Sequence, residues 1–204
     1  MRRTRVYFDG FNMFHALDEV GQDHLKWLCL RRLSESFIGK DEVLNGVKYF
    51  SAYATWDSAG LAIHQDYVAA LTAEGVTPIL GNFKKKHLRC RICSGQYHTH
   101  EEKETDVNIA IHLISDLFQD EFDRAIIVSA DTDLCSTVNM ARSLNPGKQI
   151  NVISPPGRRN RSRSLNPLFE ITKGRLAKCR LDESYTLPDG REINSPAKYK
   201  LPKY

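Results

Sequence analysis

Short apolar runs alternate with helix-like segments along most of this chain, and that alternation limits the folds open to it. Each apolar run has the length of a β-strand, and the segments between the runs carry apolar residues at helical spacing. Parallel strands require crossovers of this kind, and strands covered on both faces read as continuous apolar runs. The sequence therefore predicts an α/β fold, a three-layer α/β/α sandwich with a mostly parallel central sheet and Rossmann-like layering.

The expected elements follow from these patterns. Strands are expected at residues 5–9, 47–54, 76–80, 125–128 and 149–153, and helices at residues 11–17, 25–37, 56–74, 101–118, 134–144 and 165–181. A polar excursion at residues 81–100 interrupts the alternation and holds a Cys/His loop insertion at 84–100. We expect one domain over residues 1–182 and an extended C-terminal tail over 183–204.

Length and composition exclude several classes of protein. With 204 residues, the chain is long enough to bury a core as one domain. It has no apolar run of membrane-spanning length and no signal-peptide core, which predicts a cytoplasmic protein with no membrane partner. Its five cysteines are an odd number, so a disulfide framework is not expected. Cys29, Cys135 and Cys179 have apolar neighbours and are expected to be small buried hydrophobic residues.

Acidic residues recur where predicted strands end or a helix begins. Asp131 and Asp133 follow the apolar run at 125–128, Asp9 ends the first strand, and Asp106 lies near the start of a helix. Each has an ordinary explanation: Asp9 in a turn, Asp106 as a favourable charge at a helix N-terminus, and Asp131 as a helix cap. In open α/β sheets, however, ligands bind at the C-terminal edge of the strands.

Carboxylates that meet at one edge repel each other, and a cation relieves that repulsion. A set of oxygen ligands suits a hard ion such as Mg²⁺, which keeps waters and phosphate oxygens among its ligands. Such an ion orients and activates water against a phosphodiester. The side-chain amide of Asn12, one turn after Asp9, is placed to hold the water or a phosphate oxygen.

Three segments resemble, in order, the three motifs of NYN domains, which belong to the PIN-like nuclease superfamily. They are Tyr-Phe-Asp-Gly-Phe-Asn at 7–12, Glu-Lys-Glu-Thr-Asp-Val-Asn-Ile-Ala at 102–110 and Ser-Ala-Asp-Thr-Asp at 129–133. The resemblance covers roughly residues 4–180. It implies an NYN/PIN-like domain at 1–182 with the three-layer fold, bound Mg²⁺ or Mn²⁺, and ribonuclease activity on RNA.

The same resemblance implies roles for individual residues. By motif position, Asp9, Asp106 and Asp131 look like the metal-binding acids, with Asp133 and Asn12 in supporting catalytic roles. Lys103 matches a motif lysine that approaches a phosphate. Ala130 departs from the family, which often has glycine there; alanine permits the turn if its φ is negative.

The polar excursion carries a second set of candidate metal ligands. Cys90 and Cys93 form a Cys-x-x-Cys pair followed by His98 and His100, and His87 precedes them. These are ligand types that zinc prefers, and four of them close a structural site. The alternative is two reduced loop cysteines beside unrelated histidines. A thioredoxin-like redox pair is disfavoured, since no strand is expected to lead into Cys90 and no helix to follow it.

Basic clusters and aromatic residues are candidates for RNA contact. Arginines hold phosphates bidentately, and basic clusters give salt-sensitive, largely sequence-blind binding, although many such clusters are simply solvated. Tyr53, Trp56 and Tyr97 are candidates to stack on bases or to join the core. The candidate phosphate contacts are Lys84, Lys85, Lys86, Lys103, Arg158, Arg159, Arg161 and Arg163.

Two other functions stay open at this point. The first is an RNA-binding or regulatory NYN module whose acids bind metal without turnover. The second is a phosphohydrolase, because Asp131-Thr132-Asp133 has the form of an aspartyl nucleophile motif. That motif normally follows the first strand, and here it comes late. The sequence leaves the oligomeric state open, a homo-oligomer included.

Overall fold

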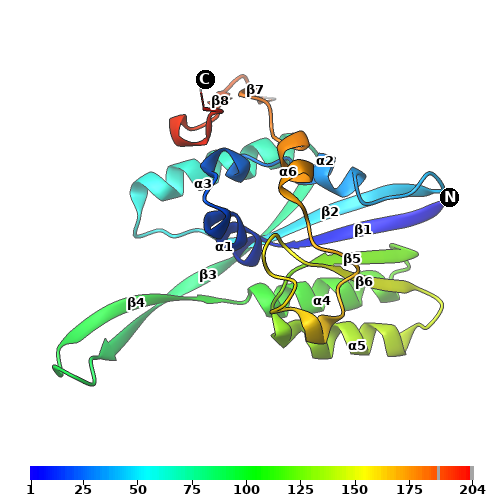
Figure 1. The fold of residues 1–204 in the computed structure, drawn as a ribbon, viewed down its shortest axis with the longest axis horizontal. Coiled ribbons are helices and arrows are strands. Elements are labelled where there is room, and N and C mark those ends of the chain that lie inside the picture. The colour runs from blue at the N-terminus through cyan, green and yellow to red at the C-terminus, as the bar shows by residue number, and fades with distance from the viewer. Residues whose placement is uncertain (188, 203–204) are drawn as a thin grey trace.

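The computed structural model describes residues 1–187 and 189–202 as an α/β protein (Figure 1). The strands are β1 (Arg2–Asp9), β2 (Glu42–Ala52), β3 (Val76–Arg89), β4 (Gln96–Lys103), β5 (Arg124–Val128), β6 (Gln149–Ile153), β7 (Ser184–Thr186) and β8 (Glu192–Asn194). The α-helices are α1 (Gly10–Val20), α2 (Leu30–Glu35), α3 (Ser58–Ala73), α4 (Thr105–Phe118), α5 (Cys135–Leu144) and α6 (Lys173–Lys178). Short 3-10 helices are η1 (Asp23–Lys26), η2 (Thr132–Leu134), η3 (Arg163–Leu165) and η4 (Ala197–Tyr199).

The main sheet has the strand order β4-β3-β2-β1-β5-β6. The pairs β3–β2, β2–β1, β1–β5 and β5–β6 are parallel. Only the edge strand β4 is antiparallel to its neighbour, β3. The predicted α/β class and mostly parallel sheet are confirmed, although the sheet is mixed because β4 turns back along β3. Since β1 lies between β2 and β5, the residue that ends β1 lies at the middle of the sheet's C-terminal edge.

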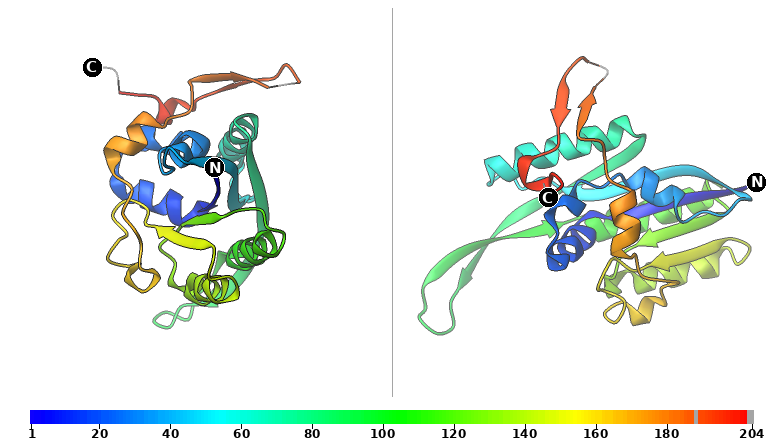
Figure 2. Two further views of the ribbon diagram at one scale, coloured as in Figure 1. Left: turned by 90° about the vertical axis from the view of Figure 1, so that its right-hand side faces the viewer. Right: turned by 45° about the horizontal axis from the view of Figure 1, so that its top comes forward.

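Apolar side chains on the two faces of the sheet join two separate cores. Along β1, Val6 and Phe8 pack in one core with α1, α2, α3 and α6, whereas Tyr7 packs in the other with α4 and α5. Successive strand residues point to opposite faces, so a strand covered by helices on both sides is apolar throughout. Helices accordingly lie on both sides of the sheet (Figure 2). None of the helices in the described ranges is long and apolar enough to cross a membrane.

The polar excursion is the largest departure from the sequence prediction. Residues 81–100 were expected as an irregular excursion, but β3 continues through them to Arg89 and the chain turns back as β4. The resulting β3–β4 hairpin projects from the body as an arm in its far part (Figure 1). The arm is largely exposed on both faces, so no apolar period marks its strands in the sequence. Helix α4 begins at Thr105 rather than at residue 101, because residues 101–103 complete β4.

Two predicted helices are also shorter than expected. The helix expected at 25–37 splits into η1 and α2, because Leu28 forms a β-bridge with Arg180 and Cys29 caps α2 through Sγ. Of the helix expected at 165–181, only α6 is helical beyond the one turn of η3. The tail folds into the β7–β8 hairpin and η4, and it buries Leu187, Ile193 and Tyr199 against the body. The predicted boundary at residue 182 stays a prediction.

Candidate metal centre

Asp9 ends the central strand β1 and caps helix α1. Its Oδ1 accepts a hydrogen bond from the backbone N–H of Asn12 at 2.9 Å, and its Oδ2 accepts one from the Ser129 hydroxyl at 2.7 Å. The residue is 3% exposed. Asp is favoured as a helix cap, and both oxygens here are held in place. The carboxylate is therefore fixed at the sheet edge before any ligand binds.

Gly10 is the first residue of α1 and lies tightly against β2. A Cβ at this position would stand 2.5 Å from the carbonyl oxygen of Phe50 and 2.6 Å from the ring of Tyr49. Such contacts are shorter than van der Waals distances, so only glycine lets the helix begin this close to the strand. The explanation of Asp9-Gly10 as a turn is thus replaced by a direct strand-to-helix junction.

Asp131 lies in the loop that follows β5, and that loop is tied to β1 and α1. Its N–H donates to the Ser129 hydroxyl at 3.0 Å, and its Oδ1 accepts from the N–H of Asp133 at 3.0 Å. The side-chain oxygen of Asn12 accepts from the N–H of Ala130 at 3.0 Å. Asn12 thus positions the loop that carries Asp131. Ala130 is not among the residues with positive φ, so alanine is unstrained where the family often has glycine.

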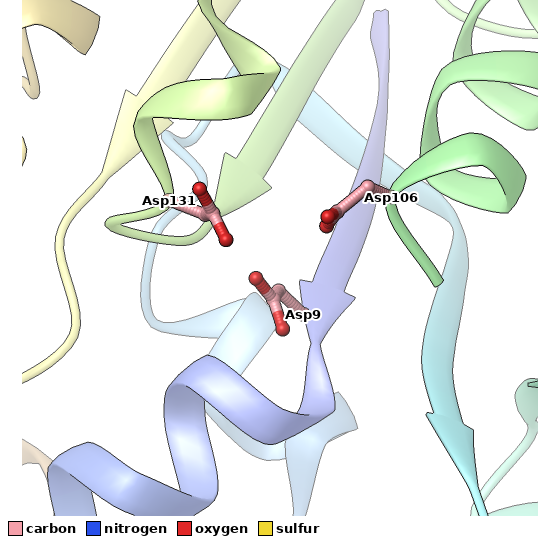
Figure 3. A group of neighbouring side chains, drawn as sticks. All are labelled: Asp9, Asp106 and Asp131. Carbon is pink, nitrogen blue, oxygen red and sulfur yellow. The ribbon is translucent and has the colours of Figure 1, made fainter. Parts of the chain in front are cut away.

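Asp106 reaches the same place from the opposite side, in the first turn of α4. The chain enters this helix through Glu104, which has a φ of 81°. The carboxylate of Glu102 accepts a hydrogen bond from the N–H of Thr105 at 3.0 Å and so stabilises the start of the helix. This sharp entry turns the Asp106 side chain toward Asp9 and Asp131 (Figure 3).

The three aspartates form one acidic group. One carboxylate oxygen from each of Asp9, Asp106 and Asp131 lies within 4.8 Å of the other two. Burial raises the pKa of Asp9 to about 7, opposed by its hydrogen bonds and reinforced by the charges of the other two aspartates. Burial also raises the pKa of Asp106 to about 6, and Asp131 and Glu102 add to that rise. Because both carboxyls resist ionisation, a bound cation would relieve the repulsion.

The ligand chemistry fits a hard divalent ion. The group offers carboxylate oxygens only, which suit Mg²⁺ and Mn²⁺. Its ligands come from three elements whose positions are fixed by hydrogen bonds within the fold. Within the described residues, these three aspartates are the group of metal-ligand side chains that lie close enough together to share one ion.

A polar cleft of about 460 Å³ opens beside the aspartates. Arg158 and Arg161, from the loop after β6, line this cleft together with the three acids. Glu19 on α1 holds both arginines, at 2.7 Å from the Arg158 guanidinium and 3.3 Å from that of Arg161. The cleft thus places two cationic groups beside an anionic group, which suits a ligand that bridges a metal ion and guanidinium groups, as a phosphate does.

Other predicted site residues lie outside this cleft. Asp133 is exposed and contributes its backbone N–H to Asp131 rather than a fourth carboxylate to the group. Lys103 and Lys86 both pair with Glu101 on the hairpin, and Lys84 and Lys85 are exposed along it. Arg159 and Arg163, in the same loop as Arg158, are exposed and do not line the cleft.

The predicted zinc ligands are spread along the hairpin. His87 and His98 face each other across the strands with ring centroids 4.3 Å apart, and Cys90 and Cys93 lie at the turn. His100 instead stacks on Trp56 at 3.6 Å. Within the described residues, no three of these side chains come together as the aspartates do. The expectation that no strand leads into Cys90 is wrong, because β3 ends at Arg89; β4 rather than a helix follows the turn.

Sequence reasoning missed three residues that build the site. Ser129 bonds both Asp9 and the N–H of Asp131, Glu102 caps the helix that carries Asp106, and Glu19 orients the arginines. Ser129 and Glu102 lie inside the motif segments, so their position was a usable signal. Glu19 carries no such signal, because its partners are 139 and 142 residues away in the chain.

A mostly parallel α/β sheet with three carboxylates at the ends of β1 and β5 and the start of α4 defines a candidate metal-binding protein of the α/β class. The family model described as NYN domain matches residues 3–167. That span is most of the chain, and the chain therefore belongs to the NYN domain family, whose fold is that of PIN-like nucleases.

Two known proteins are similar to most of this chain. The 6-hydroxy-3-succinoylpyridine 3-monooxygenase HspA of Pseudomonas putida (strain DSM 28022 / S16) is 25% identical over 225 residues, which covers 88% of this chain and 70% of that protein. The crystal structure of VPA0982, a protein of unknown function from Vibrio parahaemolyticus RIMD 2210633, matches with a TM-score of 0.56 and 16% identity. That match covers 84% of this chain and 94% of the other, and it supports the fold alone.

Proposed function

We propose that this protein is a ribonuclease that hydrolyses RNA phosphodiester bonds with Mg²⁺ or Mn²⁺ held by Asp9, Asp106 and Asp131. The observation that carries the proposal is the convergence of these three carboxylates within 4.8 Å. Family membership supports it, since NYN domains are nuclease-like. The three-layer arrangement of PIN-like nucleases is part of the same proposal.

The chain's own residues supply the positioning. An ion bound there would polarise a phosphate oxygen and lower the pKa of a bound water. Asp9 is held by Asn12 and Ser129, so its carboxylate keeps one orientation. Arg158 and Arg161 line the same cleft and are placed to hold phosphate oxygens. On the projecting hairpin, Lys84, Lys85, Lys86 and Lys103 would extend the contact along an RNA strand.

The ligand types favour hydrolysis over oxygenation. Non-haem iron oxygenases combine two histidines with one carboxylate, whereas the group here contains three carboxylates. This group is therefore poorly suited to non-haem iron oxygenation, which is one of the chemistries that the monooxygenase name of the Pseudomonas relative allows. The alternative is a non-catalytic RNA-binding or regulatory NYN module. In such a module the same acids would bind a metal ion and the same basic residues would bind RNA, without cleavage.

A cleavage assay distinguishes a ribonuclease from a non-catalytic RNA-binding module. End-labelled single-stranded RNA is incubated with purified protein in Mn²⁺ or Mg²⁺, and parallel samples contain EDTA. We expect divalent-dependent cleavage by the wild type and none by Asp9→Asn or Asp131→Asn. RNA binding without cleavage by the wild type would instead support the regulatory module.

A matched control is available on α3. Asp57 caps that helix through Gly60 N–H at 3.0 Å, just as Asp9 caps α1, but it lies outside the acidic group. Asp57→Asn should cut RNA at the wild-type rate, because asparagine caps helices as well as aspartate does. Equal cleavage by Asp9→Asn, Asp57→Asn and wild type would refute the assignment.

A further inference from the structure

A second cavity lies on the opposite side of α1 from the metal centre. Its volume is about 310 Å³, and it is bounded by α1, α3, the end of β2 and η4 of the tail. Phe11 lines both this cavity and the acidic cleft. The acidic cleft is polar and charged, whereas this cavity is walled mainly by aromatic and aliphatic side chains. It is therefore a distinct site with different chemistry, in the size range where small-molecule pockets begin, roughly 300 Å³.

Aromatic rings from three different elements form its walls. Tyr49 of β2 and Tyr67 of α3 meet edge to face with centroids 6.0 Å apart, and Tyr199 of η4 lines the cavity from the tail. The Tyr67 hydroxyl is already bonded to the carbonyl of Leu28 at 2.9 Å, so the ring rather than the hydroxyl is available to a ligand. Walls of this kind pack against another flat ring by stacking or edge contact.

The polar groups of the cavity gather around His64. Its Nε2 lies 3.2 Å from the Tyr49 hydroxyl and 3.4 Å from that of Ser51, and all three residues line the cavity. Burial lowers the pKa of His64 to about 4, so the imidazole is neutral near pH 7. A neutral imidazole beside two hydroxyls both donates and accepts hydrogen bonds, as the polar edge of a heterocycle does.

Two of the charged groups in the lining are already engaged. Lys26 bridges Asp18 and Asp23 at 2.5 and 2.7 Å, and the Asp57 carboxylate caps α3. These charges are compensated by the protein itself, so they favour no strongly charged ligand. Lys198 is exposed, with its Nζ 4.9 Å from the ring centroid of Tyr199.

We propose that this cavity binds one uncharged planar heteroaromatic ring, with the polar edge of the ring against His64 and Ser51 and its faces against the tyrosines. A free heterocycle and a base of an RNA strand share this ring chemistry. This binding requires neither the metal ion nor RNA cleavage, so it stands or fails separately from the ribonuclease proposal.

Ligand-observed saturation-transfer NMR tests the proposal with two rings, pyridin-2-one and uracil, on the full chain. We expect transfer to at least one of them and none to cyclohexanol, which is similar in size but not planar. Ala54→Leu adds volume at the cavity wall and should abolish the transfer. Ala62→Leu adds the same volume at an exposed position of α3, the helix that follows Ala54 in the chain, and should leave the transfer unchanged.

A second variant tests the polar edge. His64→Gln keeps a polar side chain but loses the imidazole, and we expect affinity to fall roughly tenfold, the worth of about one hydrogen bond. Thermal melting confirms that each variant is folded. Failure of the wild type to bind either ring, or equal binding by Ala54→Leu and Ala62→Leu, would overturn the proposal.

A competition arm distinguishes the two sources of the ring. A uridine trinucleotide is added in EDTA to the protein with its bound heterocycle. Displacement of the heterocycle, seen alike in the wild type and in Ala62→Leu, assigns the cavity to a base of an RNA strand. Retention of the heterocycle assigns it to a free small molecule, and in both cases the same ring chemistry is bound.

Discussion

Asp106 differs from its two partners in how it is held. Asp9 and Asp131 both accept hydrogen bonds from the fold, whereas the pKa of Asp106 is set by burial and by the charges of neighbouring acids, with no hydrogen bond to its carboxylate within the described residues. Asparagine has nearly the shape of aspartate without its charge. At this residue, therefore, the electrostatic cost of the acidic group can be measured without breaking a hydrogen bond.

Asp106→Asn should stabilise the protein without metal at neutral and higher pH. The folded pKa of about 6 lies above the ordinary value of 3.8, so the wild type without metal loses stability as the pH rises from about 4 to about 6. Since Asp106 is only half-buried, the variant should be more stable at pH 8 by on the order of 1–2 kcal/mol after solvent screening.

Urea unfolding in EDTA measures that difference. As the pH falls below about 3, the variant and wild type should approach equal stability, because the carboxyl is then protonated in both the folded and the unfolded wild type. Adding Mn²⁺ at pH 8 should reverse the order, since only the wild type keeps all three ligands. A variant that is less stable than wild type at pH 8 without metal would contradict the repulsion between these aspartates.

Gly10→Ala tests the junction that places Asp9. The added methyl group would stand 2.5 Å from a backbone oxygen, which cannot move without disturbing β2. We expect a loss of about 1–3 kcal/mol in the free energy of unfolding and a weaker affinity for Mn²⁺. Gly174→Ala in α6 is the control, because nothing lies within 4 Å of its added methyl group. That variant should be neutral or slightly more stable.

At the scale of elements, the strands of the parallel sheet were predictable and the hairpin was not. Strands β5 and β6 are short apolar runs, and their positions follow directly from that pattern. In β1 only Val6 to Phe8 are apolar, and the strand begins earlier than expected, at Arg2. The far part of the β3–β4 hairpin is polar and basic on both faces, and its strands exist because Lys84 to Lys86 pair with Thr99 to Glu101 across the ladder. Such pairing depends on a partner strand, which local pattern does not reveal.

The hairpin gives the zinc prediction its test. His87 and His98 are paired across the strands, and Cys90 and Cys93 follow at the turn, so zinc binding by both pairs would require the end of the hairpin to rearrange. We expect about one zinc per chain by plasma mass spectrometry of protein purified without chelator. Cys90→Ser should abolish it, and Cys135→Ser should not, because Cys135 lies on α5. Wild-type protein without zinc would refute this site.

At the scale of the whole molecule, the sequence predicted which acids come together but not how they are held. Asp9, Asp106 and Asp131 were identifiable because each lies at a strand end or a helix start and within a family motif. The pairing of Glu19 with two arginines and the aromatic cavity behind α1 both depend on residues far apart in the chain. Chain separation hides such contacts, since only the packed fold brings the elements together.

The central claim is that Asp9, Asp106 and Asp131 jointly hold one divalent ion. A crystal structure of the wild-type protein grown with Mn²⁺, with anomalous data at the manganese edge, tests it most directly. We predict a strong anomalous peak between the three carboxylates, with oxygen ligands at about 2.0–2.3 Å. A saturating Mn²⁺ concentration that gives no peak there, or a peak bound by other residues while these carboxylates stay unliganded, would contradict it.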